Sequence, residues 1–269
     1  MRFALVDGKK VIAEPGLKGF CPGCAQPVSA KCGNERVHHW AHSRNKMCDS
    51  WWEPETEWHR TWKSKFPEDW QEIYLPDEQT GEKHIADVRT SDGFVIEFQH
   101  SHINPVELKS REMFYKNMVW VVDATRLKRD YPRFLKGRKR FLIEKEGIFR
   151  INDLDECFPS SWLKSYVPVI FDFRGNEIIP DPNDLRHPLY CLFPYQIVGC
   201  GLVAEISRKA FINAVYNGKW TEKALIFMKP YFEAMKEREA LRERLKSLEL
   251  GLAFNKFVRS RSYPKRRRF

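Results

Sequence analysis

The sequence predicts a mixed α/β fold, with an α+β mixed sheet whose central part runs helix, three strands, helix, strand. Aromatic side chains recur at the four-residue spacing of one helix face, at Trp58, Trp62 and Phe66. Two alternating apolar segments flank a Ser-Asp-Gly turn, and a continuous apolar run follows downstream. With 269 residues, 42% of them hydrophobic, the chain is long enough to bury a substantial core.

The first helix of the central part is predicted to carry the aromatic stripe. Pro54 fits the first turn of such a helix, because proline lacks only an N–H that has no partner there. Glu53, Glu55 and Glu57 suit the positive end of the helix dipole. The segment QEIYLP, at residues 71–76, is predicted to be a short strand.

The next two strands are predicted to form a hairpin, HIADVRT and FVIEFQH joined by Ser-Asp-Gly. In this register Val88 faces Ile96, and Asp87 faces Glu97, with Gln99 further along the same face. Directly opposed like charges are destabilising. A divalent cation such as Mg²⁺ compensates two carboxylates in this position, and the alternative is that both face solvent.

A second helix and a fourth strand complete the central part. Asn104 can cap the helix, and Pro105 suits its first position. The run MVWVVDA, at residues 118–124, is continuously apolar and predicts a buried strand.

Composition divides the chain into four predicted regions. Residues 1–50 are rich in Cys, His and Gly and form a zinc-finger-like module, and residues 51–145 form the central α/β part. Residues 146–255 form a mixed accessory region with a charged amphipathic helix at 231–250. Residues 256–269 form a basic tail.

The charge balance predicts a polyanionic partner. The formal net charge is +10, and Lys265, Arg266, Arg267 and Arg268 lie together near the end of the chain. Such residues contact phosphate backbone without reading bases, so DNA is the predicted partner, single-stranded or duplex. The alternative is a solubilising tail.

The sequence predicts a cytoplasmic protein that does not enter a membrane. It contains no run of about 18 apolar residues and no signal peptide. A homodimer remains an open prediction, as does a recombination or helicase partner that binds the helix at 231–250.

The first 50 residues predict a structural zinc site. Cys21 and Cys24 form a C-x2-C turn that suits two thiolates on one tetrahedral ion. His42 and Cys48 are the preferred remaining ligands, with His39 as the alternative. The competing interpretation is a set of free thiols in a reducing compartment.

Asp87 and Glu97-Phe98-Gln99, within the predicted helix–strand–strand–strand–helix–strand order, resemble the PD-(D/E)XK nuclease core. The usual third residue there is Lys, so Gln99 resembles the E-x-Q variants. More specifically, the first half of the chain resembles the competence protein CoiA-like family. The matching pieces are Cys21-Pro22-Gly23-Cys24, His39-Trp40-Ala41-His42, Glu55-Thr56-Glu57-Trp58-His59, Trp62-Lys63, Ala86-Asp87, Ile96-Glu97-Phe98-Gln99-His100-Ser101, Arg111 and Tyr115.

The resemblance implies a DNA nuclease that depends on Mg²⁺ or Mn²⁺. Asp87 and Glu97 would hold the metal, and Gln99 would orient the attacking water or the phosphate without supplying positive charge. Glu55 would join the metal shell, and His59 would donate to a phosphate or orient Glu55. The family is associated with DNA taken up during natural transformation. Related cores act in restriction and phage defence.

Three further residues are predicted to contact nucleic acid. Lys63 shares a helix face with Glu55 and His59, and Arg111 and Tyr115 lie one helical turn apart. An ordinary surface position is the competing interpretation for Lys63 and for Arg111. A second function class also remains open, a zinc-dependent nucleic-acid-binding protein whose nuclease core is weak or inactive.

Overall fold

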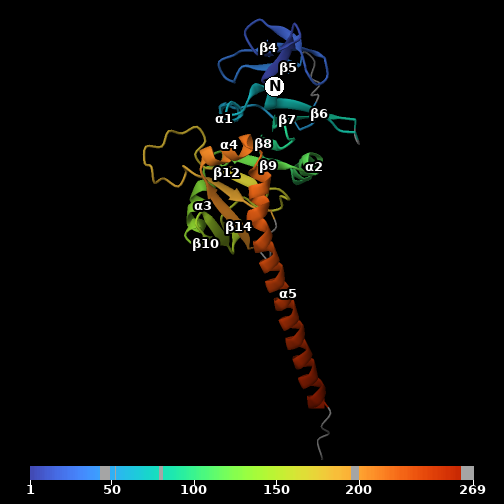
Figure 1. Ribbon diagram of the computed structural model, residues 1–269, viewed down its shortest axis with the longest axis vertical. Coiled ribbons are helices and arrows are strands. Elements are labelled where there is room, and N and C mark those ends of the chain that lie inside the picture. Colours follow the sequence, from blue (N-terminus) through green and yellow to red (C-terminus); the bar gives the residue numbers. More distant parts are fainter. Residues whose placement is uncertain (43–48, 52, 79–80, 195–199, 262–269) are drawn as a thin grey trace, which may run out of the picture. The chain divides into compact units, whose positions relative to one another are not determined.

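The computed structural model describes residues 1–42, 49–51, 53–78, 81–194 and 200–261. The chain divides into two compact units, Met1–Thr221 and Glu222–Phe269. The first unit contains both sheets of the structure, and Figure 1 shows its elements along the sequence. All the residues that form the candidate sites described below lie in this unit.

The N-terminal segment folds as a five-stranded antiparallel sheet in the order β2-β1-β3-β4-β5. The strands are β1 (Phe3–Val6), β2 (Lys9–Ile12), β3 (Lys18–Phe20), β4 (Pro27–Lys31) and β5 (His39–His42). A small core containing Ala4, Val28 and Trp40 lies under this sheet. The Trp40 indole N–H donates to the carbonyl oxygen of Val11 at 3.0 Å, so the buried ring is also hydrogen-bonded.

A nine-stranded mixed sheet forms the rest of the first unit, in the order β10-β11-β14-β13-β12-β9-β8-β7-β6. Its strands are β6 (Gln71–Pro76), β7 (Lys83–Arg89), β8 (Val95–Gln99), β9 (Met118–Asp123), β10 (Leu142–Lys145), β11 (Ile148–Ile151), β12 (Val169–Asp172), β13 (Leu189–Leu192) and β14 (Gly201–Ile206). Strands β8, β9 and β12 are parallel, and the other pairs are antiparallel.

The helices of this unit are α1 (Glu57–Lys63), α2 (Pro105–Tyr115), α3 (Asp130–Arg138) and α4 (Arg208–Tyr216), and α5 (Trp220–Arg261) begins at its end. Short 3-10 turns lie at Glu68–Trp70 and Leu154–Glu156. The order α1, β6, β7, β8, α2, β9 agrees with the predicted helix, three strands, helix, strand. Asn104 caps α2 through the Val106 N–H, with Pro105 in the first position, as predicted.

The predicted boundary between residues 145 and 146 does not separate two folding units. Strand β12 pairs in parallel with β9, so the predicted accessory region continues the central sheet. The main hydrophobic core crosses the same boundary, because Trp120 and Phe134 belong to one buried cluster with Phe171 and Tyr190. Strands β12 and β13 are buried on both faces. Because their residues do not alternate between apolar and polar, the sequence does not show their register.

Helix α1 begins later than the sequence predicts. Thr56 is its N-cap, and His59 completes a capping box, so Pro54 lies before the helix instead of in its first turn. The aromatic stripe is buried as predicted, and the indole N–H groups of Trp58 and Trp62 both donate to Asp172 Oδ2, at 3.0 and 2.9 Å. Asp172 on β12 thereby holds α1 against the central sheet.

The second unit consists of the long helix α5 in its described part. The helix continues to Arg261, so it extends beyond the predicted 231–250 and past the predicted start of the tail at 256. Leu241, Leu245 and Leu248 on it are exposed. The tail residues Lys265, Arg266, Arg267 and Arg268 lie outside the described residues. No described helix is both long enough and apolar enough to cross a membrane.

Candidate functional site

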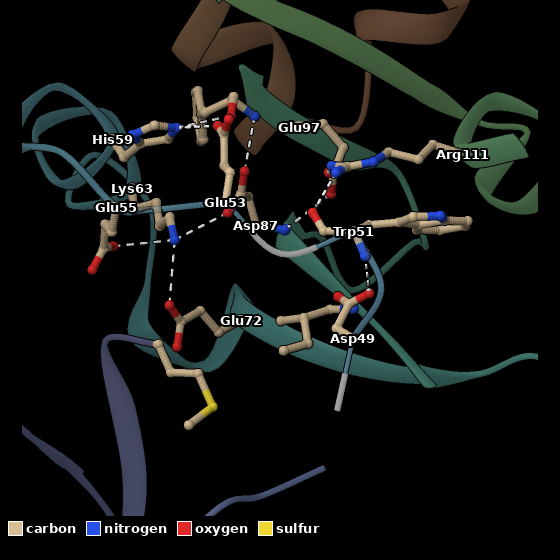
Figure 2. Close-up of a pocket in the computed structure, with 13 residues that line it drawn as sticks. Asp49, Trp51, Glu53, Glu55, His59, Lys63, Glu72, Asp87, Glu97 and Arg111 are labelled. Carbon is tan, nitrogen blue, oxygen red and sulfur yellow. Dashed lines mark hydrogen bonds and ion pairs between the residues drawn. The ribbon is translucent and has the colours of Figure 1, made fainter. Parts of the chain in front are cut away.

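A small pocket gathers carboxylates from the segment before α1 and from β6, β7 and β8, and α1 adds His59 and Lys63 (Figure 2). The side chains that line it are Met1, Asp49, Trp51, Glu53, Glu55, His59, Lys63, Glu72, Ile85, Asp87, Glu97, Phe98 and Arg111. Both predicted metal carboxylates, Asp87 and Glu97, therefore lie in one pocket. So do the predicted catalytic residues Glu55 and His59.

The hairpin of β7 and β8 brings Asp87 beside Glu97. Val88 pairs with Ile96, which confirms the predicted register. Next to the Val88–Ile96 pair, the carboxylates of Asp87 and Glu97 each accept a hydrogen bond from a main-chain N–H of the opposite strand. The Asp87 N–H donates to Glu97 Oε1 at 3.1 Å, and the Phe98 N–H donates to Asp87 Oδ2 at 2.9 Å. Each carboxylate is therefore fixed by the strand opposite its own.

Lys63 occupies the centre of the acidic pocket. Its Nζ lies 3.0 Å from Asp87 Oδ1, 3.2 Å from Glu55 Oε1 and 3.3 Å from Glu72 Oε1. Burial lowers the pKa of this ammonium, but the three carboxylates outweigh burial and raise the pKa well above its usual value. Burial likewise opposes ionisation of Glu55, but Lys63, the N-terminal ammonium and Arg60 together more than offset it, so the pKa of Glu55 is lowered.

Arg111 on α2 holds the other carboxylate of the pair. Its Nη1 donates to Glu97 Oε2 at 2.9 Å, and its Nη2 donates to Glu107 and to the main-chain oxygen of Trp51. Even with this partner, burial and then the charge of Asp87 raise the pKa of Glu97 to about 8. Glu97 is the carboxyl group of the pocket for which a further cation would be most favourable.

Glu53 is a further candidate for a functional role. The sequence predicts for it only a favourable position near the positive end of a helix dipole. Its Oε1 accepts from His59 Nε2 at 2.7 Å, and its Oε2 accepts from Gln99 Nε2 at 2.9 Å and from the Ser101 N–H at 3.2 Å. Burial raises the pKa of Glu53, but His59, the Ser101 hydroxyl and the His100 N–H together reverse the effect and lower it to about 2. The one feature of the sequence that could have pointed to Glu53 is its position shortly before Thr56, the N-cap of α1.

His59 and Gln99 both orient Glu53 in the structure. The Thr56 N–H donates to His59 Nδ1, so the proton lies on Nε2, which donates to Glu53 and approaches the Phe98 carbonyl oxygen at 3.1 Å. Both ring nitrogens of His59 are therefore engaged. Gln99 is buried and does not line the pocket, so the structure does not bring its amide to the Asp87–Glu97 pair as predicted.

Glu72 connects the two sheets at the pocket. Its carboxylate accepts from the main-chain N–H groups of Arg2 and Phe3 and contacts Lys63. Its φ of 49° lies in the left-handed region, which is rare for a residue other than glycine. Such a backbone conformation persists where several surrounding contacts fix it. At Glu72 these are the contacts of its carboxylate with the N-terminal sheet and with Lys63, and they hold that sheet against the pocket.

The structure buries the three side chains predicted to contact nucleic acid from α1 and α2. Lys63 is 4% exposed, Arg111 6% and Tyr115 8%. Lys63 and Arg111 neutralise carboxylates, and burial raises the pKa of Tyr115. Their burial leaves little side-chain surface for a phosphate contact.

A second candidate site lies in the N-terminal sheet. The ligand atoms of Cys21, Cys24 and His42 all lie within 4.8 Å of one another, and Cys24 Sγ is 3.2 Å from His42 Nε2. The predicted fourth ligand, Cys48, falls outside the described residues. The alternative ligand His39 is not part of the cluster, and its Nδ1 lies 2.9 Å from the main-chain oxygen of Val37.

The cluster fits a structural zinc ion. Two thiolates and an imidazole are ligands that zinc prefers, and the C-x2-C turn between β3 and β4 is closed by an Ala25 N–H to Cys21 oxygen bond of 2.9 Å. Among the described residues, no other His, Cys, Asp and Glu side chains bring three ligand atoms this close. The pocket carboxylates are instead arranged around Lys63 and Arg111.

Replacing Cys24 with serine is expected to remove bound zinc. Metal analysis of the purified protein should give about one zinc per wild-type chain and a loss of at least tenfold in occupancy for Cys24→Ser. Cys32→Ser is the matched control, because Cys32 is a partly buried thiol directly after β4 and outside the cluster. Equal zinc contents in the two variants would remove Cys24 from the site.

Comparison with known proteins supports a relationship over the N-terminal segment. Residues 17–50 match the family model described as Competence protein CoiA, N-terminal domain, and this stretch contains Cys21, Cys24 and His42. Searches of curated proteins and of solved structures gave no match. The match supports the resemblance to the CoiA-like competence family, in the part of the chain that carries the Cys/His cluster.

Proposed function

We propose that this protein is a divalent-metal-dependent nuclease that hydrolyses phosphodiester bonds in DNA, with its centre at Asp87 and Glu97. One observation carries the proposal. Two carboxylates from adjacent strands share a pocket, and burial together with the charge of Asp87 raises the pKa of Glu97 to about 8. A carboxylate pair that resists full ionisation is stabilised by a cation.

Mg²⁺ or Mn²⁺ fits this donor set. These ions take carboxylate oxygens together with water and phosphate oxygens, and Asp87 is the more open carboxylate of the pair, with 21% of its side chain exposed. When bound, the ion would polarise the phosphate and lower the pKa of a water molecule. Asp87 and Glu97 would hold it, and Glu55 lies on the other side of the Lys63 ammonium.

The remaining side chains of the pocket would position this pair. Gln99 stands where the resembled core usually has a lysine, and it carries no charge. Lys63, which contacts Asp87, would supply that positive charge instead. Glu53 and His59 fix the main chain from Phe98 to Ser101, where β8 ends. A nuclease centre needs such support, because small displacements of its ligands cost much of its activity.

A second candidate is a nucleic-acid-binding protein without cleavage activity. The observation that favours it is that Lys63 and Arg111 already pair with Asp87 and Glu97. A pocket whose charges are balanced internally has less need of a metal ion. The structural zinc cluster and the basic residues of the chain would then serve binding alone.

For the cellular role, the match to the CoiA N-terminal domain supports handling of DNA during natural transformation. The setting proposed is therefore processing of incoming DNA, with restriction or phage defence as the alternative. The predicted partners, a recombination protein or helicase and a second copy of the chain, remain proposals.

Cleavage of labelled single-stranded and duplex DNA tests the proposed activity. With Mg²⁺ or Mn²⁺ the wild-type protein is expected to cut, and Asp87→Asn and Glu97→Gln to lose about 100-fold or more of the rate. Asp92→Asn is the matched control, because Asp92 lies in the loop of the same hairpin and outside the pocket. Equal background cutting in all four proteins would favour the binding protein.

A further inference from the structure

A second and larger cavity, of about 240 Å³, lies at the carboxyl ends of the three parallel strands β8, β9 and β12. One water molecule needs only ~10–15 Å³ of such space. Its apolar lining includes Val122, Ala124, Phe171 and Phe173, which follow or end these strands. Ligands of open α/β sheets bind outside the carboxyl ends of the strands.

Arginine side chains dominate the polar part of this cavity. Arg126 and Arg129 line it and are exposed, and their guanidinium groups have no hydrogen-bond or ion-pair partner in the described part of the chain. Arg133 also lines it and donates from Nη2 to Asp130 at 2.8 Å, whereas its buried Nε has no partner among the described residues. The cavity therefore has guanidinium donors that nothing in the described structure satisfies.

The acidic groups of the cavity are already paired. Asp123 Oδ2 contacts His100 Nδ1 at 2.8 Å, and its Oδ1 accepts from the Thr125 N–H and hydroxyl. Asp130 is the partner of Arg133. Three arginines, Arg126, Arg129 and Arg133, line the cavity against the two aspartates, so the excess charge is positive and the cavity favours an anion.

We propose that this cavity binds a phosphoryl group of a nucleotide or nucleic-acid strand. Guanidinium groups match phosphate oxygens in geometry and charge, and Ser160 and Ser161, which also line the cavity, have hydroxyls that can donate. The anion has two possible sources, a terminal phosphate and a backbone phosphodiester, which share this chemistry.

The position of the cavity links it to the candidate nuclease centre, and this link rests on the proposed function. Ser101 lines the cavity, and its N–H donates at 3.2 Å to Glu53, which lines the carboxylate pocket. The end of β8 is thus a common wall of both sites. A strand anchored through a phosphate at the arginines would pass close to Asp87 and Glu97, whose own charges repel phosphate.

The test measures binding by the full chain without added divalent cations, so that no cleavage is required. The probes are 5′-AMP, a 5′-phosphorylated single-stranded oligonucleotide, and the same oligonucleotide with a 5′-hydroxyl. The test variant is Arg126→Ala with Arg129→Ala. The control removes the same charge from exposed residues of the same region that do not line the cavity, by Lys128→Ala with Lys136→Ala.

The arginine pair is expected to weaken oligonucleotide binding by about tenfold or more and to reduce the slope of log K against log[salt] by about 1.4, at about 0.7 per lost contact to a single strand. The lysine pair should change affinity less than threefold. Loss confined to AMP and the 5′-phosphorylated strand identifies a terminal phosphate, and equal loss for both oligonucleotides identifies the backbone.

Equal losses in the two double variants would overturn the proposal, because net charge would then explain them, and unchanged binding in both would overturn it as well. The outcome is separate from that of the proposed nuclease activity. Arginine-dependent binding by a protein that never cuts DNA would leave the phosphate site standing and reject the nuclease. If the protein cuts DNA but its binding does not depend on Arg126 and Arg129, the nuclease proposal stands and the phosphate site is rejected.

Discussion

Replacing Lys63 with methionine is expected to lower the free energy of unfolding at neutral pH by about 3–5 kcal/mol, the typical cost of removing one partner from a buried ion pair. Methionine keeps much of the side-chain volume but leaves Glu55, Glu72 and Asp87 without their shared ammonium. Because burial penalises each unpaired carboxylate, this variant should lose more stability than any single carboxylate-to-amide change in the pocket.

Urea denaturation of the Lys63→Met protein, with Lys65→Met as control, measures this effect. Lys65 is exposed and its replacement should change stability by no more than about 0.5 kcal/mol. Added Mn²⁺ should restore more stability to Lys63→Met than to wild type, because the cation can occupy the place of the ammonium. Equal stabilities for the two lysine variants would contradict the central position of Lys63.

Replacing Glu97 with glutamine is expected to change how stability depends on pH. The pKa of this carboxyl is about 8 in the folded protein against an ordinary value of 4.5. Between these values the folded state binds a proton that the unfolded state has released, so stability falls as pH rises from about 5 to 8. The slope from this group is at most about 1.4 kcal/mol per pH unit.

Glu97→Gln removes the titrating group and keeps one of the two oxygens, so it can still accept either from Arg111, which bonds Oε2, or from the Asp87 N–H, which bonds Oε1. Its stability relative to wild type should therefore increase steadily from pH 5 to pH 8, without added Mg²⁺ or Mn²⁺. Glu53 and Glu55 do not interfere, because their lowered pKa values place their effect below this window.

Glu107→Gln is the control for this measurement, because Glu107 pairs with the same arginine on a more exposed part of α2. Its stability curve should stay parallel to that of wild type across the window. If the Glu97→Gln curve is also parallel, the raised pKa of Glu97 is contradicted.

The hairpin that carries Asp87 and Glu97 could be predicted from the sequence because its signals are local. Two-residue alternation sets which side chains share a face, and the Ser-Asp-Gly loop sets the register, so Val88 lies opposite Ile96 as expected. The Cys21–Cys24 turn is local in the same sense, and His42 joins it across the adjacent strands β4 and β5.

The counter-ions and the orienting carboxylate could not be predicted, because their contacts join distant segments. Lys63 looked like a surface residue of a helix, but it touches β6 and β7 across the fold. Glu53 reaches the end of β8, and Glu72 adopts a left-handed backbone inside a segment that otherwise has a strand pattern. The strands after residue 146 are short, apolar runs that show no register in sequence.

Binding of Mn²⁺, followed by electron paramagnetic resonance on the zinc-loaded protein, tests most directly whether Asp87 and Glu97 hold a divalent cation. We expect one Mn²⁺ per wild-type chain, an affinity at least tenfold weaker in Asp87→Asn and in Glu97→Gln, and unchanged binding in Asp92→Asn. Equal Mn²⁺ affinities in all four proteins, or no binding by the wild type, would contradict a divalent-cation site at Asp87 and Glu97.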